Sequence, residues 1–495
     1  MHLISNSCRR HWPNRADTVL VVLQEKNMHD LKTRQLAGLI VGVGCASLVH
    51  AAELAYECSA LVEATKPVYE RLTIEDELPG AAFVVSGNLA RNDRSELVVS
   101  SFGELTSGPS GTVPPSAGQV TMYHNAKSGN RPNGRIDRWV PTTIVSEAEG
   151  ITFPNRPTIA DVDERRKPDV IVPGGYFFDG SLGNARGSIT WWESRNNGKK
   201  WIRHDVVTNS PFSYHSVLFD DFNGDDINDI VSVGENAGSP SDPFDDVIEL
   251  HLFAGDGNGN FSSAVTLATG GGSLLTAFDV NRDGRLDIVS PQFFGSVAGQ
   301  PFIPVAARDA DSASFVWFEN MGDGNFVKHA IGIEQGPGFA IVPVANLLGD
   351  GVTRWIATNH TNQNVTFPPF SLYPEPTVYE FTPGEDVRQL WSVRELSSPG
   401  DFPVTGGIGQ AAPGFLSAGE LNGDGRTDIA VSGDGARGVF WMEQLSDGNF
   451  VTRQLPDSED YGQAGGPVIE DLNRSGTNEI IFSSFDQNAV SIWRR

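Results

Sequence analysis

Nine-residue stretches rich in oxygen-bearing side chains recur along this chain, and each is followed by a short apolar run. Five copies are clear: DVDERRKPD at 161–169, DFNGDDIND at 221–229, DVNRDGRLD at 279–287, ELNGDGRTD at 420–428 and DLNRSGTNE at 471–479. Oxygen side chains at positions 1, 3 and 5, a backbone carbonyl at 7 and a carboxylate at 9 can surround a hard cation such as Ca2+, which takes six to eight oxygen ligands. The repeated stretch therefore predicts calcium-binding loops.

The sixth position of these loops supports the same interpretation. Gly284, Gly425 and Gly476 stand there, and glycine allows the positive φ that a tight loop needs. Asp226 takes this place in the 221 copy, and aspartate is one of the few other residues that tolerate it.

Two other kinds of loop compete with this one. An EF-hand needs a glutamate at position 12 and flanking helices, but position 12 of the 279 copy is Ser290 and β-branched runs flank the loops. A hairpin closed by Asx turns would bind no ion. We expect that second outcome for two blurred copies from Asn88 and Asn346, where position 3 is Ala90 and Leu348.

With these motifs the chain resembles the FG-GAP or VCBS-repeat proteins, whose best-known members are the seven-bladed propeller heads of integrin α subunits. The resemblance covers about residues 66–495. It implies an all-β, seven-bladed β-propeller with Ca2+-binding loops between strands one and two of several blades, and three to five Ca2+ ions. The implied ligands form four sets: Asp221, Asn223, Asp225 and Asp229; Asp279, Asn281, Asp283 and Asp287; Glu420, Asn422, Asp424 and Asp428; and Asp471, Asn473, Ser475 and Glu479. A fifth set would be Asp161, Asp163 and Asp169, but Arg165 replaces its position-5 donor and could substitute for the ion.

The remainder of each repeat predicts a four-stranded blade. Repeats start roughly 50 to 75 residues apart, which suits one blade of a propeller. Aromatic strands such as ITWWES from 189 precede glycine-rich turns, which is a hairpin signal. The last repeat stops at VSIWRR without a fourth strand, and the segment PVYERLTI at 67–74 resembles the missing one. We therefore expect the N-terminal strand to close the ring and hide the exposed sheet edge.

The start of the chain predicts export. Residues 28–52 carry a basic start, an apolar core at 36–49 and small residues suited to cleavage near Ala51 or Ala52. We expect a leader at 1–52, with Met28 as a possible true start, then a short segment at 53–65 and the propeller at 66–495. The apolar run is short for a membrane span. The prediction is a secreted, periplasmic or cell-surface monomer that is not inserted in a membrane after cleavage.

Charge and loop length indicate the partners. A formal net charge of −26 argues against nucleic acid. Repeats one to five have long connections between strands two and three, on the rim opposite the calcium loops, and long loops on a rigid scaffold are where binding usually resides. Their aromatic side chains suggest a surface for a glycan or an extracellular protein, unless they only pack against one another. The predicted ligand-binding residues are Phe177, Phe178, Phe293, Phe294, Phe367, Phe370 and Tyr373.

Signals for catalysis are few, because no metalloprotease, nucleophile-elbow or phosphate-loop motif is present. The candidates are His215, Arg156, Tyr214 and His360, which together could supply a base, a carboxylate clamp and an acid around an acidic sugar. The alternative for His215 is a histidine whose bonds are satisfied inside the propeller. The sequence thus predicts a secreted, calcium-stabilised propeller that binds a carbohydrate or protein through its long-loop face; the alternative is a polysaccharide lyase or sugar dehydratase acting at that face.

Overall fold

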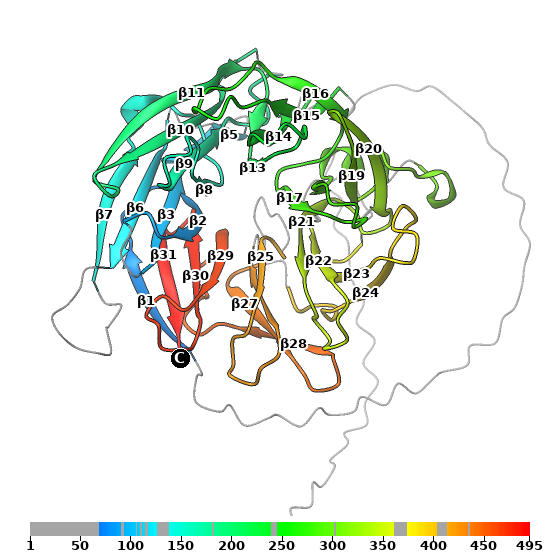
Figure 1. Ribbon diagram of the computed structural model, residues 1–495. Coiled ribbons are helices and arrows are strands. Elements are labelled where there is room, and N and C mark those ends of the chain that lie inside the picture. The colour runs from blue at the N-terminus through cyan, green and yellow to red at the C-terminus, as the bar shows by residue number, and fades with distance from the viewer. Residues whose placement is uncertain are drawn as a thin grey trace, which may run out of the picture. The chain divides into compact units, whose positions relative to one another are not determined.

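Seven antiparallel sheets stand around a common centre, and the chain passes through them in order (Figure 1). The structure, a computed structural model, describes residues 69–90, 94–104, 106–108, 111–113, 117–125, 138–180, 183–238, 245–300, 303–360, 374–402, 413–433 and 436–495. These residues belong to one unit, Glu63–Arg495. The expected leader and the segment at 53–65 lie outside the described residues. The seven-bladed propeller predicted from the sequence is confirmed.

Each sheet is one blade, and the strands run from the centre outwards. Blades one to three contain β2 (Ala81–Gly87), β3 (Glu96–Ser101), β6 (Gln119–Asn125) and β7 (Trp139–Val145); β8 (Thr158–Ala160), β9 (Asp169–Gly174), β10 (Gly187–Arg195) and β11 (Lys200–Ser210); and β12 (Ser213–Tyr214) with β13 (Leu218–Asp220), β14 (Asp229–Asn236), β15 (Val247–Phe253) and β16 (Val265–Thr269).

Blades four to seven contain β17 (Thr276–Phe278), β18 (Asp287–Pro291), β19 (Phe315–Gly322) and β20 (Asn325–Gly332); β21 (Gly338–Val344), β22 (Arg354–Asn359), β23 (Val378–Thr382) and β24 (Ser392–Glu395); β25 (Leu416–Gly419), β26 (Asp428–Ser432), β27 (Val439–Gln444) and β28 (Phe450–Gln454); and β29 (Ala464–Glu470), β30 (Glu479–Ser484), β31 (Ala489–Arg494) and β1 (Glu70–Glu75). A short ribbon of β4 (Thr106–Gly108) and β5 (Gly111–Val113) and a helix, α1 (Phe294–Gly299), lie in the connections.

Position in the blade decides the sequence pattern of each strand. The second strands β9, β18, β22, β26 and β30 are buried along their whole length, because neighbouring blades cover both of their faces. They therefore read as continuous apolar runs. The outer strand β11 has only one covered face, and its burial fluctuates along its length. Among the described residues, each pair of neighbouring blades shares an apolar cluster.

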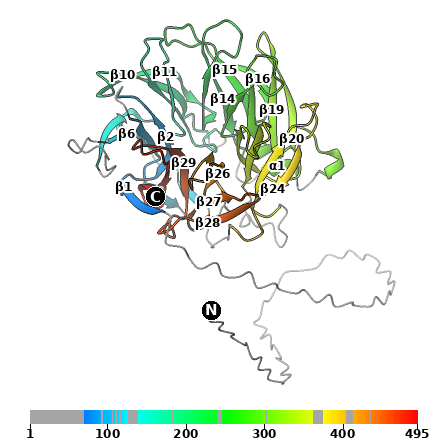
Figure 2. The same ribbon diagram turned by 60° about the horizontal axis from the view of Figure 1, so that its bottom comes forward.

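The first and last strands of the ring lie side by side. Strand β1 pairs antiparallel with β31, with Leu72 opposite Ile492, and so supplies the fourth strand of blade seven. In Figure 1 this is the contact between the blue β1 and the red β31, and Figure 2 shows the same neighbours after a turn of 60°. Tyr69, just before β1, packs in the cluster between blades six and seven. Among the described residues no helix has the length and apolar character needed to cross a membrane.

Deleting the residues up to 75 should therefore remove the strand that closes the ring. Without β1, the edge of β31 and the apolar face under Leu72 would be exposed to water, which favours aggregation. We expect loss of a single cooperative unfolding transition, measured by calorimetry. A truncation at residue 66 keeps β1 and should unfold like the full chain; a 75-residue truncation that remains soluble and equally stable would show that β1 does not close the propeller.

Candidate functional site

The five clear nine-residue loops are fastened in the same way, by the carboxylate at position 9. In blade four, Asp287 accepts the N–H of Val280 at 2.9 Å with one oxygen and the N–H of Asn320 at 2.8 Å with the other. Val280 is position 2 of the loop, and Asn320 lies on the third strand. This carboxylate therefore ties the loop to the third strand of its own blade. Asp169, Asp229 and Asp428 make the corresponding pair of bonds, and Glu479 makes the first of them.

Burial raises the pKa of these position-9 carboxyl groups. All five are at most 3% exposed. Desolvation raises the pKa of Asp169, Asp287 and Asp428 to about 6 and that of Glu479 to about 7, against the opposing effect of their backbone hydrogen bonds. It raises the pKa of Asp229 as well. A buried carboxylate held by neutral N–H groups lacks a full positive partner, and a cation would supply one.

Backbone N–H groups also arrange the carboxylates at positions 1 and 5. In blade three, Asp221 accepts the N–H of Gly224 at 2.7 Å and that of Asp226 at 2.9 Å, while Asp225 accepts the N–H of Ile227 at 2.9 Å. The turn at position 6 has the expected positive φ, 65° at Asp226 and 89° at Gly284. The loop thus points several carboxylates inward without any charged partner of its own.

An asparagine amide occupies the middle of each of the four full loops. In blade three, the side-chain N–H2 of Asn223 lies 3.2 Å from Asp225 and 3.3 Å from Asp229. The amides of Asn281 and Asn473 contact carboxylates in the same manner, at 2.9 Å from Asp283 and 2.5 Å from Glu479. The amide hydrogens carry partial positive charge at the point where the carboxylates converge. Positions 1, 3, 5 and 9 of these loops thus carry the kinds of oxygen donor that a hard cation takes. Among the described residues, three carboxylates lie within 4.8 Å of one another only at Asp161, Asp163 and Asp169.

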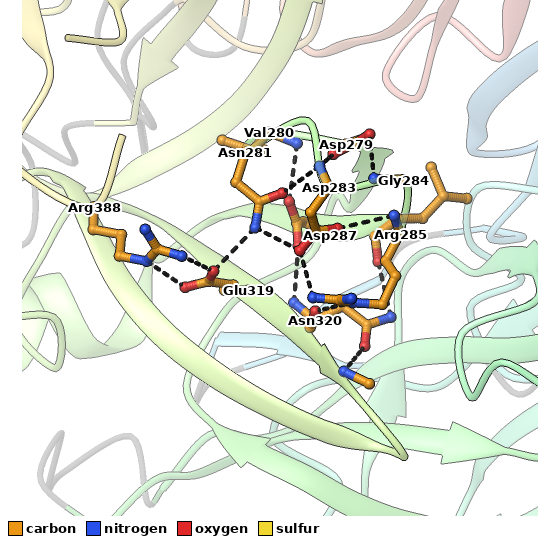
Figure 3. A network of polar contacts seen from close by, with 12 residues as sticks. Asp279, Val280, Asn281, Asp283, Gly284, Arg285, Asp287, Glu319, Asn320 and Arg388 are labelled. Carbon is orange, nitrogen blue, oxygen red and sulfur yellow. Dashed lines mark hydrogen bonds and ion pairs between the residues drawn. The ribbon is translucent and has the colours of Figure 1, made fainter. Parts of the chain in front are cut away.

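A glutamate from the third strand extends the loop of blade four, as Figure 3 shows. Glu319 accepts from Asn281 at 3.0 Å and from His329 at 2.9 Å, and it pairs with Arg388 from blade five. The Arg388 guanidinium lowers the pKa of the Glu319 carboxyl to about 2. In blade six Glu443 has the same role, with Asn422 at 3.4 Å and Arg453 as its cation.

Guanidinium groups contact loop carboxylates in four loops. In blades four and six, Arg285 pairs with Asp283 and Arg426 pairs with Asp424, each at position 5. In the 161 loop Arg165 contacts both Asp163 and Glu193, so the fifth predicted ligand set already contains a cation although Asp161, Asp163 and Asp169 lie close together. In the 346 loop Arg354 replaces the position-9 carboxylate. It holds Asp350 with two hydrogen bonds of 2.7 and 2.6 Å and lies 3.3 Å from Glu380. Sequence reasoning had identified Leu348 as the defect of this loop but missed the role of Arg354.

The opposite rim carries the connections between strands two and three, and aromatic side chains gather there. Ring-to-ring contacts of 4.3–6.2 Å form a closed aromatic circuit through Phe83, Phe102, Phe153, Tyr176, Phe177, Phe294, Phe293, His360, Phe339 and Phe415. Phe178 packs on Phe177. The predicted ligand-binding residues Phe177, Phe178, Phe293 and Phe294 thus pack against one another, because rings from several blades meet at the axis. Phe367, Phe370 and Tyr373 lie outside the described residues.

Of the four catalytic candidates, Arg156 and His215 are neighbours, whereas Tyr214 and His360 are buried in other contacts. Tyr214 is 1% exposed and bonds His251 at 3.2 Å inside the core between blades two and three. His360 is 2% exposed and stacks on Phe339. Arg156 and His215 are neighbours, because the Arg156 N–H donates to the His215 carbonyl at 3.0 Å. The missed member of this group is Glu235, fully buried, with its carboxylate 2.6 Å from Nδ1 of His215. Its place on β14 gives no signal in the sequence alone.

The contact between Glu319 and Arg388 joins two blades, so its loss should cost stability. We expect Arg388→Gln to lower the free energy of unfolding, because a buried carboxylate loses its charged partner. The matched change Arg453→Gln removes a pair within one blade whose glutamate is 22% exposed, and should cost less than about 1 kcal/mol.

The pH dependence of this difference follows from the lowered pKa. Ionised Glu319 stabilises the folded protein fully above its ordinary pKa of 4.5, and this contribution is lost as the pH falls towards 2. The gap between wild type and Arg388→Gln in urea unfolding should therefore shrink over that range. Equal losses of unfolding free energy in Arg388→Gln and Arg453→Gln would contradict a stabilising contact between Glu319 and Arg388. A difference between wild type and Arg388→Gln that grows on acidification would contradict it as well.

Comparison with known proteins identifies the repeats. Residues 221–290 and 421–482 match the sequence model of the FG-GAP-like repeat. No curated protein matches the sequence. Among solved structures, the chain is similar to a fungal alcohol oxidase of the AA5 family in complex with copper (13% identity, TM-score 0.45, covering 86% of this chain and 75% of that one). It is also similar to the GH93 α-L-arabinofuranosidase of Fusarium graminearum (9%, 0.42, 86% and 97%) and to a Penicillium chrysogenum α-L-arabinanase (12%, 0.41, 86% and 98%).

At these identities the structural likeness says nothing about activity. The family match carries more weight, because its two stretches contain the four full nine-residue loops of blades three, four, six and seven. The resemblance inferred from the sequence is confirmed: the chain is a seven-bladed β-propeller of the FG-GAP-repeat type.

Proposed function

We propose that this protein is a calcium-stabilised, exported propeller that binds a carbohydrate or an extracellular protein through the rim opposite its calcium loops. The observation that carries the calcium proposal is the contact of the Asn223 amide with Asp225 and Asp229, in a loop whose aspartates have no arginine or lysine partner among the described residues. The loops of blades four and six have the same donor positions but pair the position-5 aspartate with Arg285 or Arg426, and the loop of blade seven has Ser475 at that position.

Four loops would hold the ions, one in each of blades three, four, six and seven. When bound, Ca2+ would supply positive charge to the buried position-9 carboxylates, which accept backbone N–H groups; in blades four and six an arginine already pairs with the position-5 aspartate. The side chains at positions 1, 3, 5 and 9 would orient oxygen atoms towards it. The loops of blades two and five have Arg165 and Arg354 as built-in cations and are not included. Millimolar extracellular calcium suits such sites, in agreement with the export signal predicted at 28–52; N-terminal sequencing of the exported chain would test that signal.

Calcium removal should lower the melting temperature. An ion that binds only the folded state stabilises it by about 2.7 kcal/mol per site at a hundredfold excess over its dissociation constant. Asp225→Asn should weaken calcium binding at one site about tenfold or more, ~1.4 kcal/mol, because one ligand charge is lost. Asp226→Asn is the matched control, since it removes the same charge from a loop residue that is not a ligand. An unchanged melting curve in excess EDTA would refute the calcium proposal.

The binding proposal rests on the construction of the other rim. The aromatic circuit closes the centre and fixes the bases of the long connections, so these connections project from a rigid ring. Near the circuit, Arg156 offers an exposed positive charge in an otherwise acidic protein. This face therefore combines rigid support with a polar group that is not used in folding.

The pair His215 and Glu235 favours one alternative, a lyase or dehydratase. The buried Glu235 carboxylate lies 2.6 Å from Nδ1 of His215, and Nε2 has no partner among the described residues, so Nε2 would be the atom that acts as the base. In an elimination, such a base takes the proton next to a sugar carboxylate, a carbon–carbon double bond forms, and the leaving oxygen departs with the electron pair of the broken carbon–oxygen bond and is protonated by solvent.

A screen of neutral glycans, uronic acid polymers and extracellular matrix proteins would test binding and separate the two functions. We expect at least one ligand to bind and to protect the connections after β9 and β18 from hydrogen exchange, while the loops 221–229 and 279–287 exchange as before. New ultraviolet absorbance from an unsaturated product would identify the lyase. Protection centred on the calcium-loop rim, or no binding to any member of the panel, would contradict the proposal.

A further inference from the structure

Arg156 occupies a position that blades one, four and six fill with apolar side chains, whereas Ser216 and Gly466 stand there in blades three and seven. It lies five residues before the first loop residue, Asp161, as Phe83, Leu274 and Phe415 lie five residues before Asn88, Asp279 and Glu420. Those three side chains belong to the single apolar cluster at the centre of the ring. The repeat therefore aims the Arg156 side chain at the axis. Alternation along the strand agrees, since Asn155 before it points into the core and bonds the Tyr214 carbonyl at 2.9 Å.

The guanidinium of Arg156 has no partner among the described residues; only its backbone N–H is bonded, to His215. The side chain is exposed to solvent, yet the surrounding protein desolvates it enough to lower its pKa. The Arg156 side chain is thus exposed to solvent and also flanked by protein, and we therefore place it on the inner wall of the ring rather than on the outer surface. The Arg156 side chain therefore makes no hydrogen bond or ion pair with the described residues that would stabilise the fold.

His215 lies beside Arg156, in the segment that leads into the inner strand of blade three. Its side chain is 15% exposed, and Glu235, 0% exposed, stands 2.6 Å from Nδ1. No described residue bonds Nε2, so this nitrogen is available to a ligand. The ring of Phe177, half-buried, lies 6.3 Å from the imidazole and forms an apolar border.

We propose that Arg156 and His215 form a binding site for a sugar that carries a carboxylate, such as a uronic acid residue. Arg156 binds the carboxylate through a two-pronged hydrogen bond, the geometry for which a guanidinium is suited. Glu235 positions His215, and Nε2 accepts a hydrogen bond from a sugar hydroxyl. Phe177 packs on the C–H face of the ring. This assignment rests on the proposed binding function of the same rim and narrows its ligand class.

The choice of a sugar over an acidic peptide comes from the mixture of groups. A peptide carboxylate would need only the cation, and an open patch of several cations would serve it better. Here one cation, one hydroxyl acceptor and one aromatic edge lie together, which matches the separate carboxylate, hydroxyls and apolar face of a uronic acid.

The test compares a galacturonic acid oligomer with its methyl ester, which has the same sugar without the charge. Calorimetric titration of the full chain in calcium should show that the acid binds and that the ester binds at least tenfold more weakly. Arg156→Gln should weaken acid binding about ten- to a hundredfold, to the level of the ester, and leave ester binding unchanged. Arg437→Gln, an exposed arginine in a short connection of the same rim, is the matched control and should change neither.

Melting curves test separately whether the variants fold like the wild type. Because the Arg156 guanidinium has no partner in the fold, Arg156→Gln should melt like the wild type, and Arg156→Lys should retain part of the acid affinity. Equal binding of acid and ester, wild-type acid binding by Arg156→Gln, or no binding of the acid would overturn the inference. If neutral glycans or proteins still bind this rim, only the uronic acid site fails; if nothing binds, the proposed function fails with it. Binding of poly-glutamate that depends on Arg156, without binding of the sugar acid, would assign the site to acidic peptides instead.

Discussion

A buried carboxylate at the start of the second strand, present in every blade except blade five, is the interaction on which this propeller depends. Asp287 shows the pattern: one oxygen holds the loop that enters the strand, and the other holds the third strand beside it. The side chain is fully buried because the next blade covers it. Three elements of the blade are thereby fixed relative to one another at a single point, on the rim where the donor loops lie.

The carboxylates of these loops gather negative charge, and different blades place different cationic groups beside them. Blade two places Arg165 in the loop, and blade five replaces the carboxylate itself with Arg354. Blade four adds Arg388 from its neighbour, which also connects two blades. Blade three has no arginine in contact with its loop among the described residues, and there the carboxylates converge on an amide. In a chain with a formal charge of −26, metal ions bound at such loops would also offset part of the excess negative charge.

The sequence predicted the repeat, the blades and the closing strand because each depends on local spacing. Nine-residue loops, hairpin turns and buried apolar runs are set by backbone conformation within one blade, and the strand at 70–75 was recognisable by its likeness to other outer strands. What the sequence could not reveal depends on contacts between blades. Phe102 and Phe153 touch because separate blades meet at the axis, so aromatic residues that looked free for a ligand became a closed circuit. Glu235 lies far along the chain from Arg156, and no spacing rule connects them.

The central claim is that the four loops with a complete set of donor residues bind calcium, whereas the loops in which Arg165 stands at position 5 or Arg354 at position 9 do not. A crystal structure grown in calcium, with anomalous scattering used to locate the ions, tests it most directly. The account predicts ions in the loops 221–229, 279–287, 420–428 and 471–479, and none at 161–169 or 346–354, where Arg165 and Arg354 stand. Ions beside those arginines, or empty loops in blades three, four, six and seven at millimolar calcium, would contradict it.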